Sequence, residues 1–306
     1  MDPGNRSVVV RALLANLGIS VGKLVVYLIT GSASMLAESV HSLADSSNQG
    51  LLLYGGRSAL RVPTSEHPFG YGRERYFWAF VVALVIFSLG GLFAVYEGVH
   101  KLLHPVPLTQ PWLAIGILVF AALLEGSALR AAVIEAGKQR GTASWIEFVR
   151  RTKNPELPVV LLEDAGALLG LVLALTGVAL AMVTGEPRFD ALGSVAIGIL
   201  LGAIAIILAI EMRSLLIGEA VSPEHRTAIL EAIEGNERVV RVIHMRTQHI
   251  GPDEVLVGAK VEFSSDLSVA QLAETIDAIE AEIRQRTPVC KVIYIEPDLY
   301  RTQAAP

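Results

Sequence analysis

Residues 37–49 read AESVHSLADSSNQ and lie within an otherwise apolar stretch long enough to cross a bilayer. Four of its polar residues recur at intervals of three, four and three: Glu38, His41, Asp45 and Asn48. On a helix this spacing places all four on one face. A carboxylate near the bilayer centre costs at least ~2.5 kcal/mol, so such a face needs a partner or a task. An imidazole one turn from a carboxylate is also a suitable half-site for a divalent transition metal.

A second acidic segment, PVVLLEDAGALLG, occupies residues 158–170. Adjacent helical residues point about 100° apart, so Glu163 and Asp164 cannot both face one ion without distortion. We expect one of them to bind an ion and the other to pair with a cation such as Lys23. A single polar residue would favour a simple hydrogen-bonded contact between helices. A histidine and an aspartate, matched by a second acidic segment, favour the passage of an ion.

The composition is that of a membrane protein. Of the 306 residues, 52% are hydrophobic, and the mean hydropathy is +0.52, which is more apolar than an ordinary soluble protein. The first residues lack the pattern of a signal peptide, so the first apolar run is expected to be retained. The sequence predicts a mostly α-helical membrane protein with a six-helix transmembrane bundle in residues 1–217. The apolar runs are 8–29, 35–53, 76–99, 112–134, 157–183 and 191–210.

Basic residues concentrate in alternate loops. The segment between the second and third runs contains Arg57, Arg61, Arg73 and Arg75, whereas the loops predicted on the opposite side contain at most one basic residue each. Because short cytoplasmic loops are enriched in Lys and Arg, both termini are expected in the cytoplasm. The net charge of −5 gives no support for nucleic-acid binding. The single cysteine, Cys290, excludes an intramolecular disulfide and a cysteine-rich zinc site.

Residues 218–306 differ in composition from the preceding part of the chain. Ser222 followed by Pro223 is typical of a helix start. The remaining pattern indicates, in order, a strand, a strand, an amphipathic helix and a strand: 239–247, 255–263, 268–286 and 289–296. This order predicts a small α+β domain of the ferredoxin-like kind, on the cytoplasmic side. At about 80 residues its core is modest, so dimerisation is an expected source of added stability.

Three motifs carry a family resemblance: HSLAD at residues 41–45, HPFGYG at 67–72 and LLED at 161–164. Together with the predicted spans and the small cytoplasmic domain, they resemble the cation diffusion facilitator family of divalent-metal/proton antiporters. The local sequences look like the branch that contains the mitochondrial zinc transporter and bacterial relatives. For this chain the resemblance implies an integral protein of the bacterial inner membrane.

The resemblance implies a tetrahedral transport site with two residues from the second span and two from the fifth. His41 and Asp45 match the first pair, and Asp164 matches the aspartate of the second. The fourth position holds Val160, where relatives carry histidine or aspartate. An open position suits an ion that must leave, because closed zinc sites of four protein ligands tend to be structural. Besides water, three residues are candidates to complete or support the site: Glu163, Asn48 and Glu38.

Metal binding outside the membrane is not expected to be strong. Many relatives bind metal between the second and third spans through an acid and two histidines. Here His67 matches one histidine, while Thr64 and Tyr71 occupy the other two positions. We interpret residues 66–75 as a structural turn, with weak metal binding by His67, beside Glu66, as the alternative. In the final domain, Lys260 and Tyr294 occupy positions that metal-sensing relatives give to histidine. A dimerisation module is therefore expected, and three candidate ligands remain there: His244, His249 and Glu296.

Two further glutamates lie in or near spans. Glu97 is close to the end of the third run, where solvation is easy. Glu125 lies deeper in the fourth run, where it can hydrogen-bond across the bundle or relay protons. We interpret both as structural.

These observations predict a secondary transporter that exports divalent transition-metal cations from the cytoplasm in exchange for protons. Metal ligands must be deprotonated, so metal and protons exclude one another at the site. Zinc is the expected cargo, with manganese, iron, cobalt and cadmium left open. The expected partners are divalent metal ions, protons, the lipid bilayer and a second copy of the chain. No organic cofactor is expected, and no enzymatic activity, since the sequence has no H-E-x-x-H motif.

The alternative function is that of a non-transporting membrane partner, or a metal-sensing scaffold that acts through its cytoplasmic domain. The valine at position 160 motivates this alternative, because it removes one ligand of the implied site.

Overall fold

The computed structural model describes residues 3–301, with side chains from residue 17 onward. The fold divides into two compact units, one of Met1–Ser58 with Glu74–Arg213 and the other of Ala59–Arg73 with Ser214–Pro306. The second unit thus includes the loop after the second predicted span. The predicted cytoplasmic location of the termini concerns residues outside those described.

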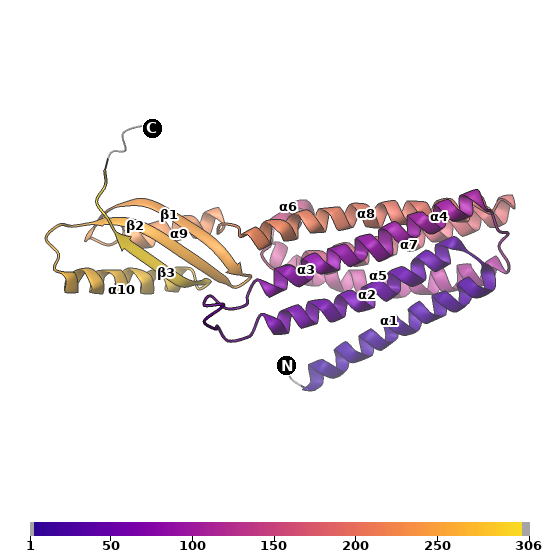
Figure 1. The fold of residues 1–306 in the computed structure, drawn as a ribbon, viewed down its shortest axis with the longest axis horizontal. Coiled ribbons are helices and arrows are strands. Elements are labelled where there is room, and N and C mark those ends of the chain that lie inside the picture. Colours follow the sequence, from indigo (N-terminus) through magenta and orange to yellow (C-terminus); the bar gives the residue numbers. More distant parts are fainter. Residues whose placement is uncertain (1–2, 302–306) are drawn as a thin grey trace. The chain divides into compact units, whose positions relative to one another are not determined.

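The first unit is built from long helices that lie beside one another (Figure 1). In chain order they are α1 (Pro3–Thr30), α2 (Ala33–Ser58), α3 (Glu74–Val85), the π-helical segment η1 (Ile86–Leu92), α4 (Phe93–Leu103), α5 (Pro111–Arg140), the short α6 (Trp145–Arg151), α7 (Glu156–Thr184) and α8 (Arg188–Ile217). Each of the six predicted apolar runs coincides with one long helical segment, since α3, η1 and α4 follow one another without a break.

Within the described residues, four helices are long and apolar enough to cross a membrane: Glu74–Leu103, Pro111–Arg140, Glu156–Thr184 and Arg188–Ile217. The apolar part of α1 that could be assessed, Leu17–Thr30, is shorter. Polar residues interrupt α2, which contains three serines, a histidine and two acidic residues within residues 38–46. The mostly helical membrane unit is confirmed, and the membrane crossing of α1 and α2 stays a prediction.

Glycines allow the η1–α4 segment to approach α8 closely. A Cβ at Gly98 would lie 2.7 Å from the Val195 side chain and 2.8 Å from the Ala191 carbonyl oxygen. A Cβ at Gly198 would lie 2.6 Å from the carbonyl oxygen of Gly91. Only residues without a Cβ fit at these distances, as is common where membrane helices pack through small residues.

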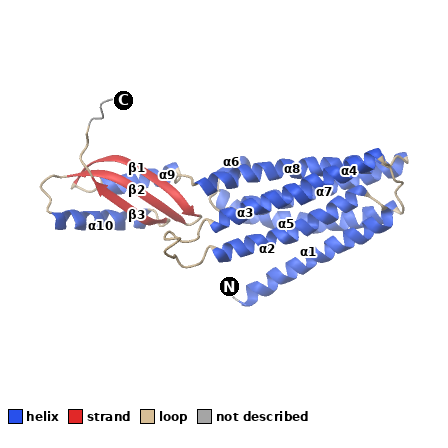
Figure 2. Ribbon diagram, in the orientation of Figure 1, coloured by secondary structure: helices blue, strands red, loops and turns tan. Residues whose placement is uncertain are grey.

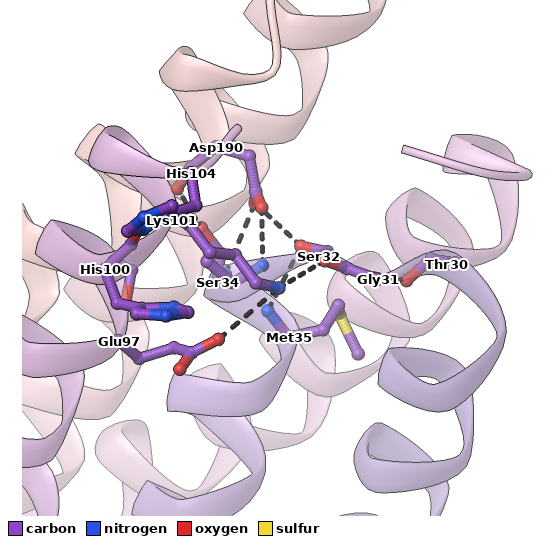
Figure 3. A network of polar contacts seen from close by, with 12 residues as sticks. Thr30, Gly31, Ser32, Ser34, Met35, Glu97, His100, Lys101, His104 and Asp190 are labelled. Carbon is purple, nitrogen blue, oxygen red and sulfur yellow. Dashed lines mark hydrogen bonds and ion pairs between the residues drawn. The ribbon is translucent and has the colours of Figure 1, made fainter. Parts of the chain in front are cut away.

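A carboxylate from a distant helix caps the start of α2 (Figure 3). Asp190, in the first turn of α8, is only 2% exposed. It accepts hydrogen bonds from the Ser32 hydroxyl at 2.7 Å and from the backbone N–H of Ala33 at 2.5 Å. A third bond comes from the backbone N–H of Ser34 at 3.3 Å. The carboxylate therefore satisfies the free N–H groups of the first turn of α2 and lies at the positive end of its dipole.

Lys101 of α4 contacts the turn between α1 and α2 (Figure 3). Its ammonium group donates a hydrogen bond to the carbonyl oxygen of Gly31 and lies 5.0 Å from the centroid of the Tyr27 ring. It also lies 3.4 Å from the carboxylate of Glu97, whose side chain is only 12% exposed. Glu97 is thus held in an ion pair instead of being freely solvated.

The second unit has the predicted order of helix, strand, strand, helix and strand, which Figure 2 distinguishes by colour. Strand β1 pairs antiparallel with β2, and β2 pairs parallel with β3, in the sheet order β1-β2-β3. The predicted small α+β domain is therefore confirmed. Its elements are α9 (Pro223–Glu234), β1 (Val239–Gly251), β2 (Glu254–Phe263), α10 (Val269–Arg286) and β3 (Cys290–Pro297).

The core of this unit lies between the sheet and the two helices. Strand β2 alternates strictly between buried and half-buried residues, as expected of a strand with one covered face. Val255 and Val257 from its buried face belong to the same apolar cluster as Ile233 of α9 and Ile279 of α10. Both helices begin with a serine cap, at Ser222 and Ser268, as the sequence pattern indicates.

The cap on α2 gives a stability prediction. Asp190→Ala should lower the free energy of unfolding by about 1–2 kcal/mol, because the first turn of α2 loses its cap. Asp190→Asn should lose less, since an asparagine oxygen also accepts the backbone hydrogen bonds. Thermal unfolding of the purified protein in detergent measures both. Arg188→Ala serves as the control, because the Arg188 side chain is 58% exposed. An equal loss in the control variant would contradict the prediction.

The burial of Cys290 gives a second prediction. Burial raises the pKa of this thiol to about 11, and the residue is fully enclosed. At pH 8 a thiol with this pKa is ionised in roughly one molecule in a thousand. Maleimide labelling should therefore be very slow in the native protein, rise with pH, and become complete after denaturation. A thiol introduced at the exposed Ser265 by Ser265→Cys is the positive control, and equal labelling rates at the two sites would refute the burial.

Candidate metal site

The polar face of α2 is buried as a whole. Glu38 and Asn48 are 0% exposed, His41 is 1% exposed and Asp45 is 8% exposed. The helical spacing noted in the sequence therefore places the four residues on the packed side of the helix. Such a buried row must be satisfied by neighbouring helices or by a ligand.

At the N-terminal end of this row, a side chain from α1 pairs with the buried polar groups of α2. Lys23, 1% exposed, lies with its Nζ 3.0 Å from Oε2 of Glu38 and donates a hydrogen bond of 2.7 Å to the hydroxyl of Ser42. The predicted pairing of Lys23 with Glu163 or Asp164 is therefore wrong. The reason is geometric, because Lys23 lies on the helix that packs directly against α2 and meets the nearest carboxylate there. Glu38 thus serves as an ion-pair partner, although its Oε1 has no hydrogen-bond partner among the described residues.

In the next part of the row, several polar atoms make no hydrogen bond to a described residue. Nδ1 of His41 lies 3.4 Å from Oδ1 of Asp45. Neither ring nitrogen of His41 and not this oxygen of Asp45 makes a hydrogen bond within the described part of the chain. Gly90 of the π-helical segment lies beside the imidazole, since a Cβ there would be 3.8 Å from Nδ1. Buried imidazole and carboxylate atoms without partners are the donor set expected of a cation site.

Helix α7 brings Glu163, and not Asp164, directly against α2. Asn48 donates a hydrogen bond of 3.3 Å from its Nδ2 to Oε1 of Glu163, which is 7% exposed. Asp164 is half-buried on the adjoining face of the helix. Val160, one turn before Asp164, is 36% exposed. Successive helical residues are rotated by about 100° around the axis. Glu163 therefore contacts the polar face of α2, whereas Asp164 lies on the adjoining face.

The start of α7 is fixed by a bidentate ion pair. Arg75, in the first turn of α3, donates to both carboxylate oxygens of Glu156, at 2.6 and 2.7 Å. The carbonyl of the Asn154 side chain accepts a hydrogen bond from the backbone N–H of Glu156. Helix α7 begins at Glu156. Bidentate arginine–carboxylate pairs fix geometry well, so this contact sets the position of the acidic pair two turns later.

A polar cavity of about 80 Å³ lies between α1, α2, α5 and α7. Ile19, Leu124 and Ala128 supply its apolar lining. None of the lining residues is basic. The volume accommodates several water molecules or a partly hydrated ion. Six polar side chains line the cavity: Ser42, Asp45, Gln49, Glu125, Glu163 and Asp164.

The structure brings three of the predicted ligands to this one cavity, namely Asp45, Glu163 and Asp164. His41 lies behind Asp45 and is not part of the lining. Among the described residues, no three histidine, cysteine or acidic side chains converge closely enough to hold a metal ion. Coordination of a cation here would therefore require the side chains to move inward.

Sequence reasoning missed the position of Glu125 on this cavity. The sequence does contain a signal for it, namely a carboxylate near the middle of an apolar span, which is costly unless it has a function.

The candidates outside the membrane unit have other partners. The ring of His67 stacks near the ring of Tyr71 at 4.6 Å, and the Tyr71 hydroxyl lies 3.2 Å from Oγ1 of Thr64. The backbone N–H of Thr64 donates a hydrogen bond to the carbonyl oxygen of His67, and the backbone N–H of His67 donates one to Oγ1 of Thr64, at 3.2 Å each. The guanidinium of Arg61 lies 5.5 Å from the centroid of the Tyr71 ring. These contacts make the loop a compact turn, as the sequence indicates.

In the sheet, Lys260 lies between two of the candidate ligands, His244 and Glu296. His244 lies opposite Lys260 in the β1–β2 ladder, and Lys260 lies opposite Glu296 in the β2–β3 ladder. The Lys260 ammonium lies 3.0 Å from both Glu296 and Asp298. Hydrogen bonds to Asp298 and Glu296 raise the pKa of Lys260, so it stays charged. A permanent cation in the middle of this row disfavours a bound metal ion.

His249, the third candidate in this domain, is buried, with its Nδ1 3.3 Å from the carbonyl oxygen of Gly251. His244 is exposed, so the two histidines lie apart as strand alternation predicts.

Comparison with known proteins finds relatives that match most of the chain, across both units. The chain is 36% identical over 268 residues to a Xenopus laevis protein named proton-coupled zinc antiporter SLC30A9, mitochondrial, covering 86% of this chain and 48% of that protein. It is 31% identical to metal tolerance protein C4 of Arabidopsis thaliana, covering 88% of this chain and 59% of that protein. It is 27% identical to the cation-efflux pump FieF of Escherichia coli, over 94% of this chain and 91% of that protein.

The chain spans about half the length of the SLC30A9 proteins it matches. The family profile described as the cation efflux transmembrane domain matches residues 9–217, and that of the cation efflux protein cytoplasmic domain matches residues 221–298. Because both profiles match in order and together cover nearly the whole chain, the resemblance noted in the sequence is confirmed, and the chain belongs to the cation efflux, or cation diffusion facilitator, family of integral membrane proteins.

Proposed function

We propose that this chain exports divalent transition-metal cations, with zinc as the principal cargo, from the cytoplasm in exchange for protons. The single observation that carries the proposal is the cavity lined by Asp45, Glu163 and Asp164 of α2 and α7, beside the imidazole of His41, which makes no hydrogen bond to a described residue. The names of the relatives support it, since one is a proton-coupled zinc antiporter and another a cation-efflux pump.

Exchange with protons follows from the chemistry of the donors. Imidazole and carboxylate groups bind a metal ion only when they are deprotonated. A cation in the cavity and protons on His41, Asp45 and Glu163 therefore exclude one another. If the helices expose the cavity alternately to the two sides of the membrane, metal leaves on the side where protons are available to replace it. Inward movement of the side chains would close the site around the ion, and outward movement would release it.

The donor set bears on the choice of metal. One imidazole suits zinc, and several carboxylates accept manganese and iron as well. Cobalt and cadmium belong to the same proposed range of cargo. The proposal needs no organic cofactor and assigns the chain no enzymatic reaction.

The proposed assembly is a homodimer formed through the second unit. The sheet of this unit has helices packed against its buried face, while His244, Tyr294 and Glu296 are exposed. An open sheet face on a small domain is a suitable surface for a second copy. The proposed location is the bacterial inner membrane, with both termini in the cytoplasm, as the distribution of basic residues indicates.

The first test is transport by the purified protein in vesicles. An imposed pH gradient should drive zinc uptake, and Asp45→Asn or Glu163→Gln should lower the rate at least about tenfold, because each variant removes a donor from the site. Glu135→Gln is a matched control, since Glu135 is exposed and pairs with Lys138 at the end of α5. Unchanged flux in both site variants would refute the proposed site. No flux in the unaltered protein would instead favour the non-transporting partner.

The second test concerns the valine at the fourth family position. Val160→His should leave the apparent zinc affinity within about twofold, or ~0.4 kcal/mol, because Val160 is 36% exposed and does not line the cavity. The KM for zinc in the vesicle assay measures this. A marked gain in affinity would show that this side chain reaches the ion and that α7 is rotated relative to the arrangement described.

A further inference from the structure

Glu125 lies near the middle of α5, fourteen residues after its first residue, Pro111, and fifteen before its last, Arg140. It is half-buried and lines the cavity together with Asp45, Glu163 and Asp164. Within the described part of the chain, no hydrogen bond or ion pair joins the Glu125 side chain to another residue. The structural role expected from the sequence, a hydrogen bond across the bundle, therefore finds no partner there. A carboxylate in the middle of an apolar helix needs another reason to be there.

A second, independent observation points to a ligand in this cavity. Asp45 is 8% exposed, lines the cavity, and has an Oδ1 atom, 3.4 Å from Nδ1 of His41, that makes no hydrogen bond to a described residue. Lys23, the cation that acts electrostatically on Glu125, is already paired with Glu38. The four carboxylates around this space consequently have no basic side chain in the lining to balance them. A bound dication would supply that balance.

We propose that Glu125 is a further ligand for the transported divalent cation, so that α5 joins α2 and α7 in building the site. The inference rests on the proposed function and concerns the same cavity. Glu125 then contributes the donor that Val160 cannot provide. The resulting set of one imidazole and several carboxylates is rich in oxygen, which favours divalent cations that accept carboxylate ligands, such as zinc, manganese and iron.

The first experiment measures affinity and transport separately in the full-length protein. In detergent, zinc binding is followed by competition with a chromophoric chelator, and in vesicles the KM and maximal rate are measured. Glu125→Gln should raise both the dissociation constant and the KM at least about tenfold. Glu125→Asp, which keeps the charge, should restore much of the affinity. Glu135→Gln, on the same helix and outside the cavity, should match the unaltered protein.

The outcomes separate this inference from the proposed function. If Glu125→Gln binds and transports zinc like the unaltered protein, Glu125 is not a ligand, although the transporter proposal stands. If the maximal rate falls while zinc affinity is unchanged, Glu125 acts on protons or on movement, and the inference is again overturned. If the unaltered protein neither binds nor moves zinc, the proposed function itself fails.

A second variant tests the same point without requiring transport. A thiol introduced by Glu125→Cys should be labelled by maleimide, and zinc should slow that labelling at least about tenfold by occupying the cavity. The native Cys290 contributes little background, because burial raises its pKa to about 11. A thiol introduced by Glu135→Cys should label at the same rate with and without zinc. Equal labelling at position 125 with and without zinc would overturn the inference.

Discussion

The cost of burying a polar helix face organises the first unit of this protein. Helix α2 presents Glu38, His41, Asp45 and Asn48 to its neighbours, and all four are nearly or fully buried. The polar groups of this face are satisfied at one end of the helix and not at the other. Near one end, Lys23 neutralises Glu38, and the Ser20 and Ser39 hydroxyls each donate to the other's backbone carbonyl oxygen. Further along, the imidazole and a carboxylate oxygen make no hydrogen bond to a described residue. The protein thus satisfies one half of the face with its own side chains, and the other half is where we propose that the cation binds.

The ends of the helices explain how this arrangement is held in place. Asp190 fixes one end of α2 through three hydrogen bonds, and the Arg75–Glu156 pair fixes the first turn of α7. Each of the two helices that carry the acidic residues is therefore anchored at its first turn, α2 by Asp190 and α7 by Arg75. Movement that opens or closes the cavity is consequently expected between these anchors, where Asn48 of α2 donates a hydrogen bond to Glu163 of α7.

Much of the fold can be predicted from the sequence, because its signals are local. The strands and helices of the second unit follow from alternation, amphipathic spacing and serine caps, and their observed bounds differ from the expected ones by a few residues. The site is harder to predict. Helix α7 is apolar on nearly all sides, so its hydrophobic pattern does not determine which of Glu163 and Asp164 faces α2. That choice is made by packing at glycines, since a Cβ at Gly170 would lie 2.8 Å from the Glu38 carboxylate and one at Gly166 would lie 2.6 Å from Ile204. The position of Glu125 was missed for the same reason, because it depends on how α5 is turned against its neighbours.

The spread of the acidic groups around the cavity is itself consistent with transport. A closed set of four protein ligands holds zinc tightly enough to be structural, whereas an exporter must release its ion in every cycle. Here no three candidate ligands among the described residues converge closely enough to hold a metal ion, and the carboxylates line a cavity of about 80 Å³. In the proposed transport cycle, binding supplies the free energy that draws the side chains together, and replacement of the ion by protons removes that attraction. Because each protonated carboxyl or imidazole group loses its attraction for the ion, the residues proposed to bind the cation would also make its release depend on protons.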